Sequence, residues 1–238
     1  MFSGIYCQIS TVTEVPVKAG GSISIPCLYN EQHKKNVKYL CKGKKWQSCE
    51  KVIDTSQATT GRYAIVDDRH QNIFNVTINE LTDKDRTFWC AVEKLGMDVK
   101  QDFKLSVTSG SASLYVEQQE IAAVEKRSVT VICYYKNKKV IRWCRLSSTC
   151  VKEQLGQIDG TTVKLNSSVY GMFNVTMSEL RTESSGWYYC ATENLQMPVH
   201  VAVYESVMTT TVSTTTQSPS TTTFTGITES YTLSAHNI

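Results

Sequence analysis

The arrangement of the cysteines constrains the fold of this chain more than any other feature. Eight of the nine cysteines form two sets of four in the same order, with corresponding members 100 to 106 residues apart. Matched sets of this kind favour an oxidising compartment, in which disulfides persist. A repeat of about one hundred residues predicts one β-sandwich domain per copy rather than a short solenoid unit. The two sets are Cys27, Cys41, Cys49, Cys90 and Cys133, Cys144, Cys150, Cys190.

The sequence around the cysteines repeats as well. The stretch IFNVTINELTDKDRTFWCAVE (73–93) aligns with MFNVTMSELRTESSGWYYCATE (172–193). In the first copy Phe74, Val76 and Ile78 alternate with polar residues, which is the period of a strand with one face in water. The second copy alternates in the same way, and amphipathic stretches of helix length are absent. The sequence therefore predicts an all-β fold.

Composition indicates where the domains end. Hydrophobic residues make up 41% of the 238 residues, which is enough for a core in each repeat. We expect tandem domains at residues 8–108 and 109–205. Threonine and serine dominate after that point, and such a segment cannot bury a core. Residues 206–238 are therefore expected to form a disordered, O-glycosylated stalk.

The positions of the cysteines suggest how they pair. Two of each set lie in strand-like runs and are expected to join the two sheets of an immunoglobulin-type sandwich. Leu40 should point inward from its strand, so Cys41 points outward and is expected to close a short hairpin on the outer face. The expected disulfides are Cys27–Cys90, Cys41–Cys49, Cys133–Cys190 and Cys144–Cys150.

Zinc and thiol chemistry are the alternatives for the closely spaced cysteines. Their spacings of eight and six residues differ from those of zinc knuckles, and no Cys-x-x-Cys motif is present. We therefore assign no metal and no cofactor. Cys7 has no counterpart in the second repeat, and we expect it to be unpaired at the edge of a removed leader. A thiol that links two chains is the alternative.

The two cysteine pairs of each repeat, with KYLC (38–41), FWC (88–90) and YYC (188–190), resemble a V-set immunoglobulin domain of a particular kind. They are similar to the polymeric immunoglobulin receptor and to the CMRF-like leukocyte receptors. The resemblance covers residues 8–205 and implies a cell-surface immune receptor. It implies domains that bind polymeric immunoglobulin or, in the leukocyte branch, lipid head groups and other ligands.

The first repeat differs from the second at two positions that matter for this resemblance. The core tryptophan that precedes the third-strand cysteine is Leu40 in the first repeat, whereas Trp143 keeps it in the second. Arg62 in the first repeat is placed to pair with Asp83 or Asp85 across the base of the sandwich, and the second repeat has no such arginine.

A basic segment is the first candidate for ligand binding. Residues 31–51 contain seven lysines and two glutamates, although the net charge of the chain is only +3. An exposed basic patch with an aromatic side chain suits an acidic protein surface, a sialylated glycan or anionic lipid head groups. A solvated strand edge, where lysines discourage aggregation, is the alternative. The candidate contacts are Lys34, Lys35, Lys44, Lys45 and Trp46.

Asp98 is a further candidate contact, in the loop EKLGMDVKQD (93–102) that follows Cys90. In some lipid-binding relatives the corresponding loop carries an acid that binds metal. A single aspartate in a loop more often faces solvent, and we assign no metal to it.

Three glycosylation acceptors are present, at Asn75, Asn166 and Asn174. By the strand alternation Asn75 and Asn174 face outward, on the sheet opposite the clamped hairpin. Sugars there are expected to cover one face of each domain and to leave the other face free.

The remaining features exclude several functional classes. The small net charge does not suit a nucleic-acid binder, and no constellation of catalytic residues stands out, so we expect no enzyme. No apolar run reaches the roughly 18 residues of a membrane helix, and the first residues lack an export signal. We expect both segments to be missing from this sequence.

We therefore hypothesise that the chain is the ligand-binding ectodomain of a CMRF-like immune receptor. It is expected on the outer side of the plasma membrane, or as a secreted form if the chain is complete. Its expected partner is a protein ligand or an anionic lipid head group. The alternative is binding and transport of polymeric immunoglobulin.

Overall fold

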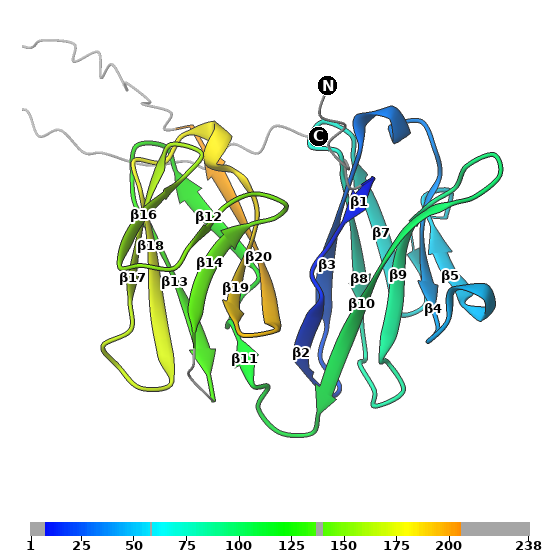
Figure 1. Cartoon of the computed structure of the whole chain (residues 1–238), viewed down its shortest axis with the longest axis horizontal. Helices are drawn as coiled ribbons and strands as arrows, with labels where there is room; N and C mark the ends of the chain where they lie inside the picture. Colours follow the sequence, from blue (N-terminus) through cyan, green and yellow to red (C-terminus); the bar gives the residue numbers. More distant parts are fainter. Residues whose placement is uncertain (1–7, 58, 137–139, 206–238) are drawn as a thin grey trace, which may run out of the picture.

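The structure is a computed structural model that describes residues 8–57, 59–136 and 140–205. Cys7 and the predicted stalk at 206–238 lie outside the described residues. The strands form four five-stranded sheets, which pair into two β-sandwiches. Short 3₁₀ helices are the only helices in the described part of the chain. The predicted all-β fold with two immunoglobulin-like domains is confirmed (Figure 1).

The first domain contains the sheets β1-β3-β8-β7-β6 and β2-β10-β9-β4-β5. Its elements are β1 (Ile9–Ser10), β2 (Glu14–Lys18), β3 (Ile23–Tyr29), η1 (Glu31–His33), β4 (Lys38–Lys42), η2 (Trp46–Ser48), β5 (Glu50–Asp54), β6 (Thr59–Thr60), β7 (Tyr63–Asp68), β8 (Ile73–Ile78), β9 (Thr87–Val92) and β10 (Val99–Thr108).

The second domain repeats this topology with the sheets β11-β13-β18-β17-β16 and β12-β20-β19-β14-β15. Its elements are β11 (Leu114–Tyr115), β12 (Glu120–Val124), β13 (Val129–Tyr135), β14 (Ile141–Arg145), β15 (Cys150–Val151), β16 (Leu155–Ile158), β17 (Thr161–Asn166), β18 (Met172–Ser178), η3 (Thr182–Ser184), β19 (Gly186–Thr192) and β20 (Leu195–Tyr204).

Alternating side chains build the core of each sandwich. In β8, Phe74, Val76 and Ile78 are buried, whereas the residues between them face out of the sandwich. Each fully buried side chain of this kind contributes about 1.5–3 kcal/mol relative to an exposed one. The equivalent side chains of β18 are also buried: Phe173, Val175 and Met177.

Four disulfides complete the two domains, in the same pairs that we expect from the sequence. In each domain one disulfide joins the facing sheets, and the other closes a hairpin on the outer face. These eight cysteines are therefore unavailable as zinc ligands or free thiols. The pairs are Cys27–Cys90, Cys41–Cys49, Cys133–Cys190 and Cys144–Cys150.

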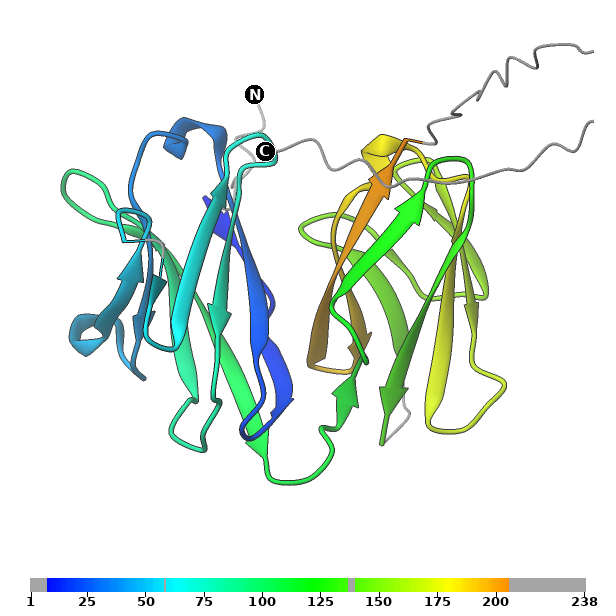
Figure 2. The ribbon, with the colours of Figure 1, turned by 180° about the vertical axis from the view of Figure 1, so that it is seen from behind.

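The two domains stand side by side in opposite directions. β10 runs into residues 109–113, and β11 leaves this connection in the reverse direction (Figures 1 and 2). The loop between β9 and β10 therefore lies at the same end of the molecule as the end of β20. Among the described residues, none of the helices has the length and apolar character needed to cross a membrane.

Candidate functional site

An aromatic cluster covers the outer face of the first domain's sheet β2-β10-β9-β4-β5. Trp46, from the clamped hairpin, lies 6.3 Å from Tyr39 and 5.7 Å from Trp89, measured between ring centroids. The rings pack around the Cys41–Cys49 disulfide. The Trp89 indole N–H donates to a backbone carbonyl of the same hairpin, at 2.8 Å. We call these three rings and the disulfide the aromatic platform.

Two lysines lie against the platform. Lys51 Nζ is 4.5 Å from the centroid of the Tyr39 ring, and Lys100 Nζ is 4.7 Å from that of Trp46. Cation–π contacts of this length contribute about 0.5–1 kcal/mol at exposed sites. Tyr39 is buried, whereas Trp46 and Trp89 are partly exposed, so the platform presents the surface of two indole rings bordered by positive charge.

The loop between β9 and β10 projects beyond the platform and carries two exposed apolar side chains. Leu95 is fully exposed and Met97 is 78% exposed. We call this pair the hairpin tip. Exposed apolar side chains next to an apolar surface can bind a partner protein, so the hairpin tip beside the aromatic platform is a candidate anchor.

Asp98 fixes the base of this loop. One carboxylate oxygen accepts a hydrogen bond from the Lys94 backbone N–H at 2.9 Å, and the other accepts from the Tyr39 hydroxyl. Burial and the hydrogen bond to Asp98 raise the pKa of Tyr39 well above its ordinary value, so its hydroxyl stays protonated and donates. Asp98 thus holds the loop against the aromatic platform instead of pointing freely into solvent. No three His, Cys, Asp or Glu side chains gather as a metal site in the described ranges.

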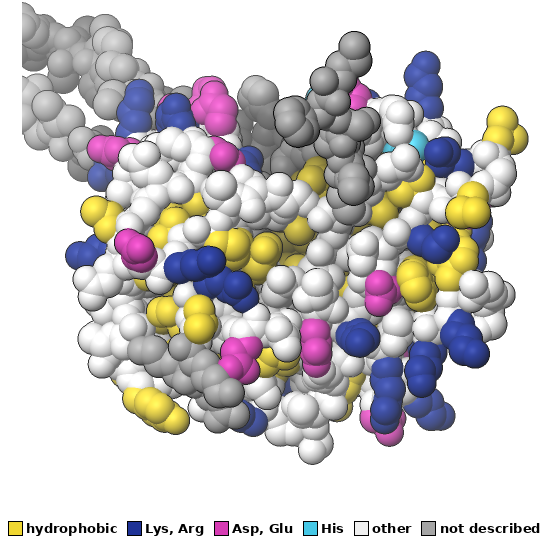
Figure 3. Space-filling view, viewed as in Figure 1, with side chains coloured by type: hydrophobic (Ala, Val, Ile, Leu, Met, Phe, Trp, Pro, Cys, Tyr) yellow, Lys and Arg dark blue, Asp and Glu magenta, His cyan; other side chains and the backbone are white. Residues whose placement is uncertain are grey.

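The lysines of the basic segment differ in their exposure and partners. Lys35, Lys44 and Lys45 are exposed, and Figure 3 shows lysine and arginine side chains along the outer side of the first domain. Lys34 pairs with Glu31 at 2.9 Å.

Lys38 and Lys42 correct the expectation of seven surface lysines. Lys38 is fully buried, and its Nζ donates to Asp67 at 2.9 Å and to a backbone carbonyl. Lys42 is turned toward the base of the sandwich, where it pairs with the buried Asp85 at 2.7 Å. The exposed positive charge is therefore carried by fewer side chains than the sequence suggested.

The second domain lacks an equivalent of this site. Thr192 and Leu195 pair directly, so the turn between β19 and β20 holds only two residues and offers no projecting loop. Trp187, on the outer face of the corresponding sheet, is only 3% exposed. It is covered by side chains of the first domain.

The interface between the domains explains this burial. Leu28 and Ile73, on the outer face of the first domain's sheet β1-β3-β8-β7-β6, pack against Leu146 and Trp187. This is the sheet that we expected sugars to cover. The contact leaves the aromatic platform of the first domain open and occupies the corresponding face of the second domain.

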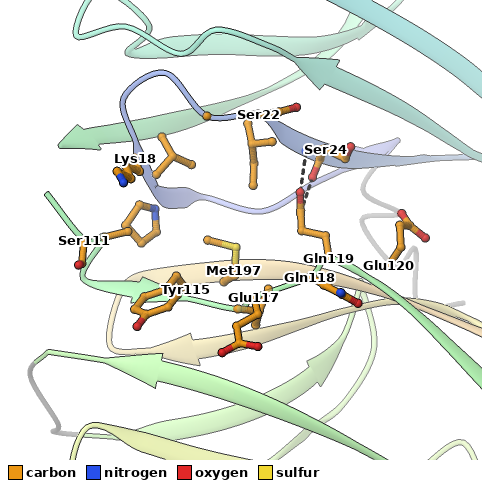
Figure 4. Close-up of a pocket in the computed structure, with 16 residues that line it drawn as sticks. Lys18, Ser22, Ser24, Ser111, Tyr115, Glu117, Gln118, Gln119, Glu120 and Met197 are labelled. Atoms are coloured by element: carbon orange, nitrogen blue, oxygen red, sulfur yellow. Dashed lines mark hydrogen bonds between the residues drawn. The ribbon is translucent and has the colours of Figure 1, made fainter. Parts of the chain in front are cut away.

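Side-chain amides lock the same interface. The Gln119 amide accepts from the Ser24 N–H at 2.9 Å and donates to the Ser24 carbonyl at 3.0 Å, as Figure 4 shows. Gln196 accepts from the Thr13 N–H at 2.8 Å. Beside this contact a cavity of about 710 Å³ runs between the domains, with Met197 on one wall (Figure 4).

Sequence reasoning missed several residues of the site. Leu95 and Met97 lie in the loop in which the sequence analysis names only Asp98. Two large apolar residues beside a glycine in a loop are a usable signal of an exposed contact. Tyr39, Trp89 and Lys100 belong to three strands, and only the register of the sheet brings them together.

Comparisons with known proteins agree with the two-domain fold. No protein-family model matches the chain. CMRF35-like molecule 7 of Mus musculus is 32% identical over 94 residues, which is 37% of this chain and 45% of that protein. The polymeric immunoglobulin receptor of Rattus norvegicus is 24% identical over 208 residues, 78% of this chain and 26% of that receptor. The chain thus spans less than half the length of these relatives.

One solved structure has a similar extent. The ectodomain of a teleost fish polymeric Ig receptor is 28% identical, covers 84% of this chain and 99% of the solved chain, and has a TM-score of 0.40. In its sequence relatives and its repeated cysteine pattern, the chain is similar to the immunoglobulin-domain immune receptors that include the polymeric immunoglobulin receptor and the CMRF35-like molecules.

Proposed function

We propose that this chain is the ligand-binding ectodomain of a cell-surface immune receptor, and that it binds a protein partner through its first domain. The observation that carries the proposal is the asymmetry between the domains. The first domain presents an open aromatic platform and a projecting hairpin tip, whereas the second domain uses the equivalent face to hold the first. The place of action is the outer side of the plasma membrane, or the extracellular fluid for a secreted form.

The chemistry of this face suits a protein partner. Burying Leu95 and Met97 in a partner contributes about 1.5–3 kcal/mol for each side chain. Aromatic side chains such as Trp46 are frequent energetic centres of interfaces. The Cys41–Cys49 disulfide and the Asp98 contacts order the face before binding, which lowers the conformational entropy lost on association.

A binding experiment on residues 8–205 tests the proposal. The double variant Leu95→Ser/Met97→Ser is expected to lose at least tenfold in affinity for a cell-surface or immunoglobulin ligand, with unchanged thermal stability because both side chains are exposed. The matched control is Val169→Ser/Tyr170→Ser, which removes two exposed apolar side chains from a loop of the second domain. Equal affinity of both variants and the wild type would refute a site at the hairpin tip.

Charge reversal separates the lysines from the hairpin tip. Lys44→Glu/Lys45→Glu is expected to slow association with an acidic partner and to remove most of its salt dependence. Lys152→Glu/Lys164→Glu makes the same change in charge at exposed positions of the second domain and is the control. Anionic lipid vesicles, with and without calcium, form a separate arm. Vesicle binding that survives the Leu95 and Met97 changes would point to lipid head groups instead.

Binding of polymeric immunoglobulin is the second candidate function. It is favoured by the extent of the similarity, because polymeric immunoglobulin receptors of five species align over 74–79% of this chain. The CMRF35-like molecules align over 37–40%, which is about one domain. Binding of polymeric but not monomeric immunoglobulin by residues 8–205 would support this candidate. Equal binding of both forms, or of neither, would exclude it.

A further inference from the structure

The glycosylation acceptor Asn75 lies beside the contact between the two domains. It occupies the outer face of β8, where it is paired across the sheet with Pro26 of β3 and with Val66 of β7. Pro26 is buried although its side chain faces out of the sandwich, whereas Val66 is 67% exposed. Asn75 therefore lies at the border between the covered part and the open part of this face.

The second domain touches this face on both sides of the Pro26–Asn75 row. Two residues before Pro26 in β3, Ser24 forms two hydrogen bonds with Gln119 of the second domain. Two residues after Pro26, Leu28 and its cross-strand partner Ile73 pack against the second domain. Residues two apart in a strand are separated by about 6.6 Å. Each of the two contacts therefore lies about that far along the sheet from Asn75, one on each side of it.

The corresponding acceptor of the second domain has exposed neighbours on both adjacent strands. Asn174 of β18 is paired with Ile132 of β13, which is 38% exposed, and with the exposed Asn166 of β17. Ile132 holds the position of Pro26 in the repeat. The two acceptors therefore share a sequence motif and a strand position but differ in what covers the neighbouring strand.

We propose that Asn75 is an N-glycan acceptor whose glycan loosens the packing of the two domains. A core glycan is much larger than the asparagine side chain, and only the side toward Val66 is open to it. The wall of the second domain on the other side limits the orientations of the sugar. Moving the domains apart restores these orientations, so the glycan shifts the population toward the loosened arrangement. A glycan on Asn174 meets no such wall.

Two backbone amides report on this packing directly. The N–H groups of Thr13 and Ser24 donate only across the interface, to Gln196 and Gln119. Hydrogen exchange at these amides is measured on chains secreted from glycosylating cells, after mass spectrometry has established which asparagines carry a glycan. Small-angle X-ray scattering of the same samples gives the radius of gyration.

The glycosylated wild type is expected to exchange both amides about tenfold faster than Asn75→Gln, which corresponds to about 1.4 kcal/mol of packing free energy. It is also expected to have the larger radius of gyration. Asn174→Gln, the matched control, is expected to behave as the wild type. Enzymatic removal of the glycan from the wild type is expected to reproduce Asn75→Gln, which excludes an effect of the glutamine itself.

Two results would overturn the proposal. An unmodified Asn75 in the secreted wild type would remove the acceptor. A glycan on Asn75 with exchange rates equal to those of Asn75→Gln would remove its effect on packing. Neither result depends on ligand binding, so the proposed function stands or falls separately.

Discussion

Asp85 is a buried, multiply hydrogen-bonded charge at the base of the first domain. Its carboxylate is fully buried and accepts hydrogen bonds from Arg62 at 2.6 Å, from Lys42 at 2.7 Å and from the backbone and hydroxyl of Thr82. Burial alone would raise the pKa of Asp85, but these hydrogen bonds outweigh it and hold the pKa well below its usual value. The ion pair with Arg62 joins the two sheets at the base of the sandwich.

Replacing this carboxylate is expected to destabilise the first domain. Asp85→Asn leaves Arg62 and Lys42 without their counter-charge, which costs about 3 kcal/mol of unfolding free energy. This is the low end for a buried pair, because both cations remain partly exposed to water. Urea unfolding measures the change, and Asp83→Asn, an exposed carboxylate in the same turn, is expected to cost less than 0.5 kcal/mol. Equal effects of the two substitutions would contradict this account.

The pH dependence follows from the same lowered pKa. A carboxyl whose native pKa lies below its unfolded value stabilises the fold above that unfolded value, about 3.9, and loses this contribution as the pH falls through the native pKa. The difference in unfolding free energy between the wild type and Asp85→Asn is therefore expected to be constant from about pH 5 to 8. It is expected to shrink below about pH 4. A difference that grows on acidification would contradict the assignment.

Of the two buried ion pairs of the first domain, the sequence predicted that of Arg62 but not that of Lys38. The sequence predicts that Arg62 pairs with Asp83 or Asp85 across the base of the sandwich, and in the structure its partner is Asp85. The alternation that turns Leu40 inward places Lys38 on the same face, but a lysine there is expected to be buried only if a partner accepts its charge, and its partner Asp67 is 29 residues away in the sequence. A buried lysine is recognised only once the side chain that accepts its charge is known.

The clamped hairpin is the element that carries the aromatic platform. Closing the Cys41–Cys49 loop restricts the unfolded chain and places Trp46 on Tyr39 and Trp89. The sequence predicted this element well, because cysteine spacing and strand alternation are local properties. It did not predict the order of the β9–β10 loop, which depends on the contact between Asp98 and Tyr39 in different strands.

Comparing the removal of each hairpin disulfide is expected to distinguish an effect on stability from an effect on ligand binding. Cys41→Ser/Cys49→Ser lowers the unfolding free energy by about 2.5 kcal/mol, and Cys144→Ser/Cys150→Ser by about 2 kcal/mol, from the loop lengths. Only the first pair is expected to weaken ligand binding, since only it supports the aromatic platform. Calorimetry and a binding assay measure the two effects. Equal loss of binding in both variants would show that the loss reflects general destabilisation.

The whole molecule differs from two independent domains because one sheet face of each is used to hold the other. The repeat predicted the number of domains and their fold. It did not predict their packing, because Gln119, Gln196 and Trp187 carry no pattern that marks them as interface residues. For the same reason the sequence predicts equal surroundings for the two strands that carry Asn75 and Asn174, whereas the structure shows different neighbours.

Hydroxyl-radical footprinting of the Asn75→Gln chain tests the central claim most directly, because it compares the two outer faces in one sample. The account predicts rapid oxidation of Met97 and measurable oxidation of Trp46 on the first domain, with Trp187 protected on the second. It also predicts that a bound protein ligand protects Met97. Oxidation of Trp187 as fast as that of Trp46 in the free chain would contradict the claim that the first domain covers the second and alone offers an open face.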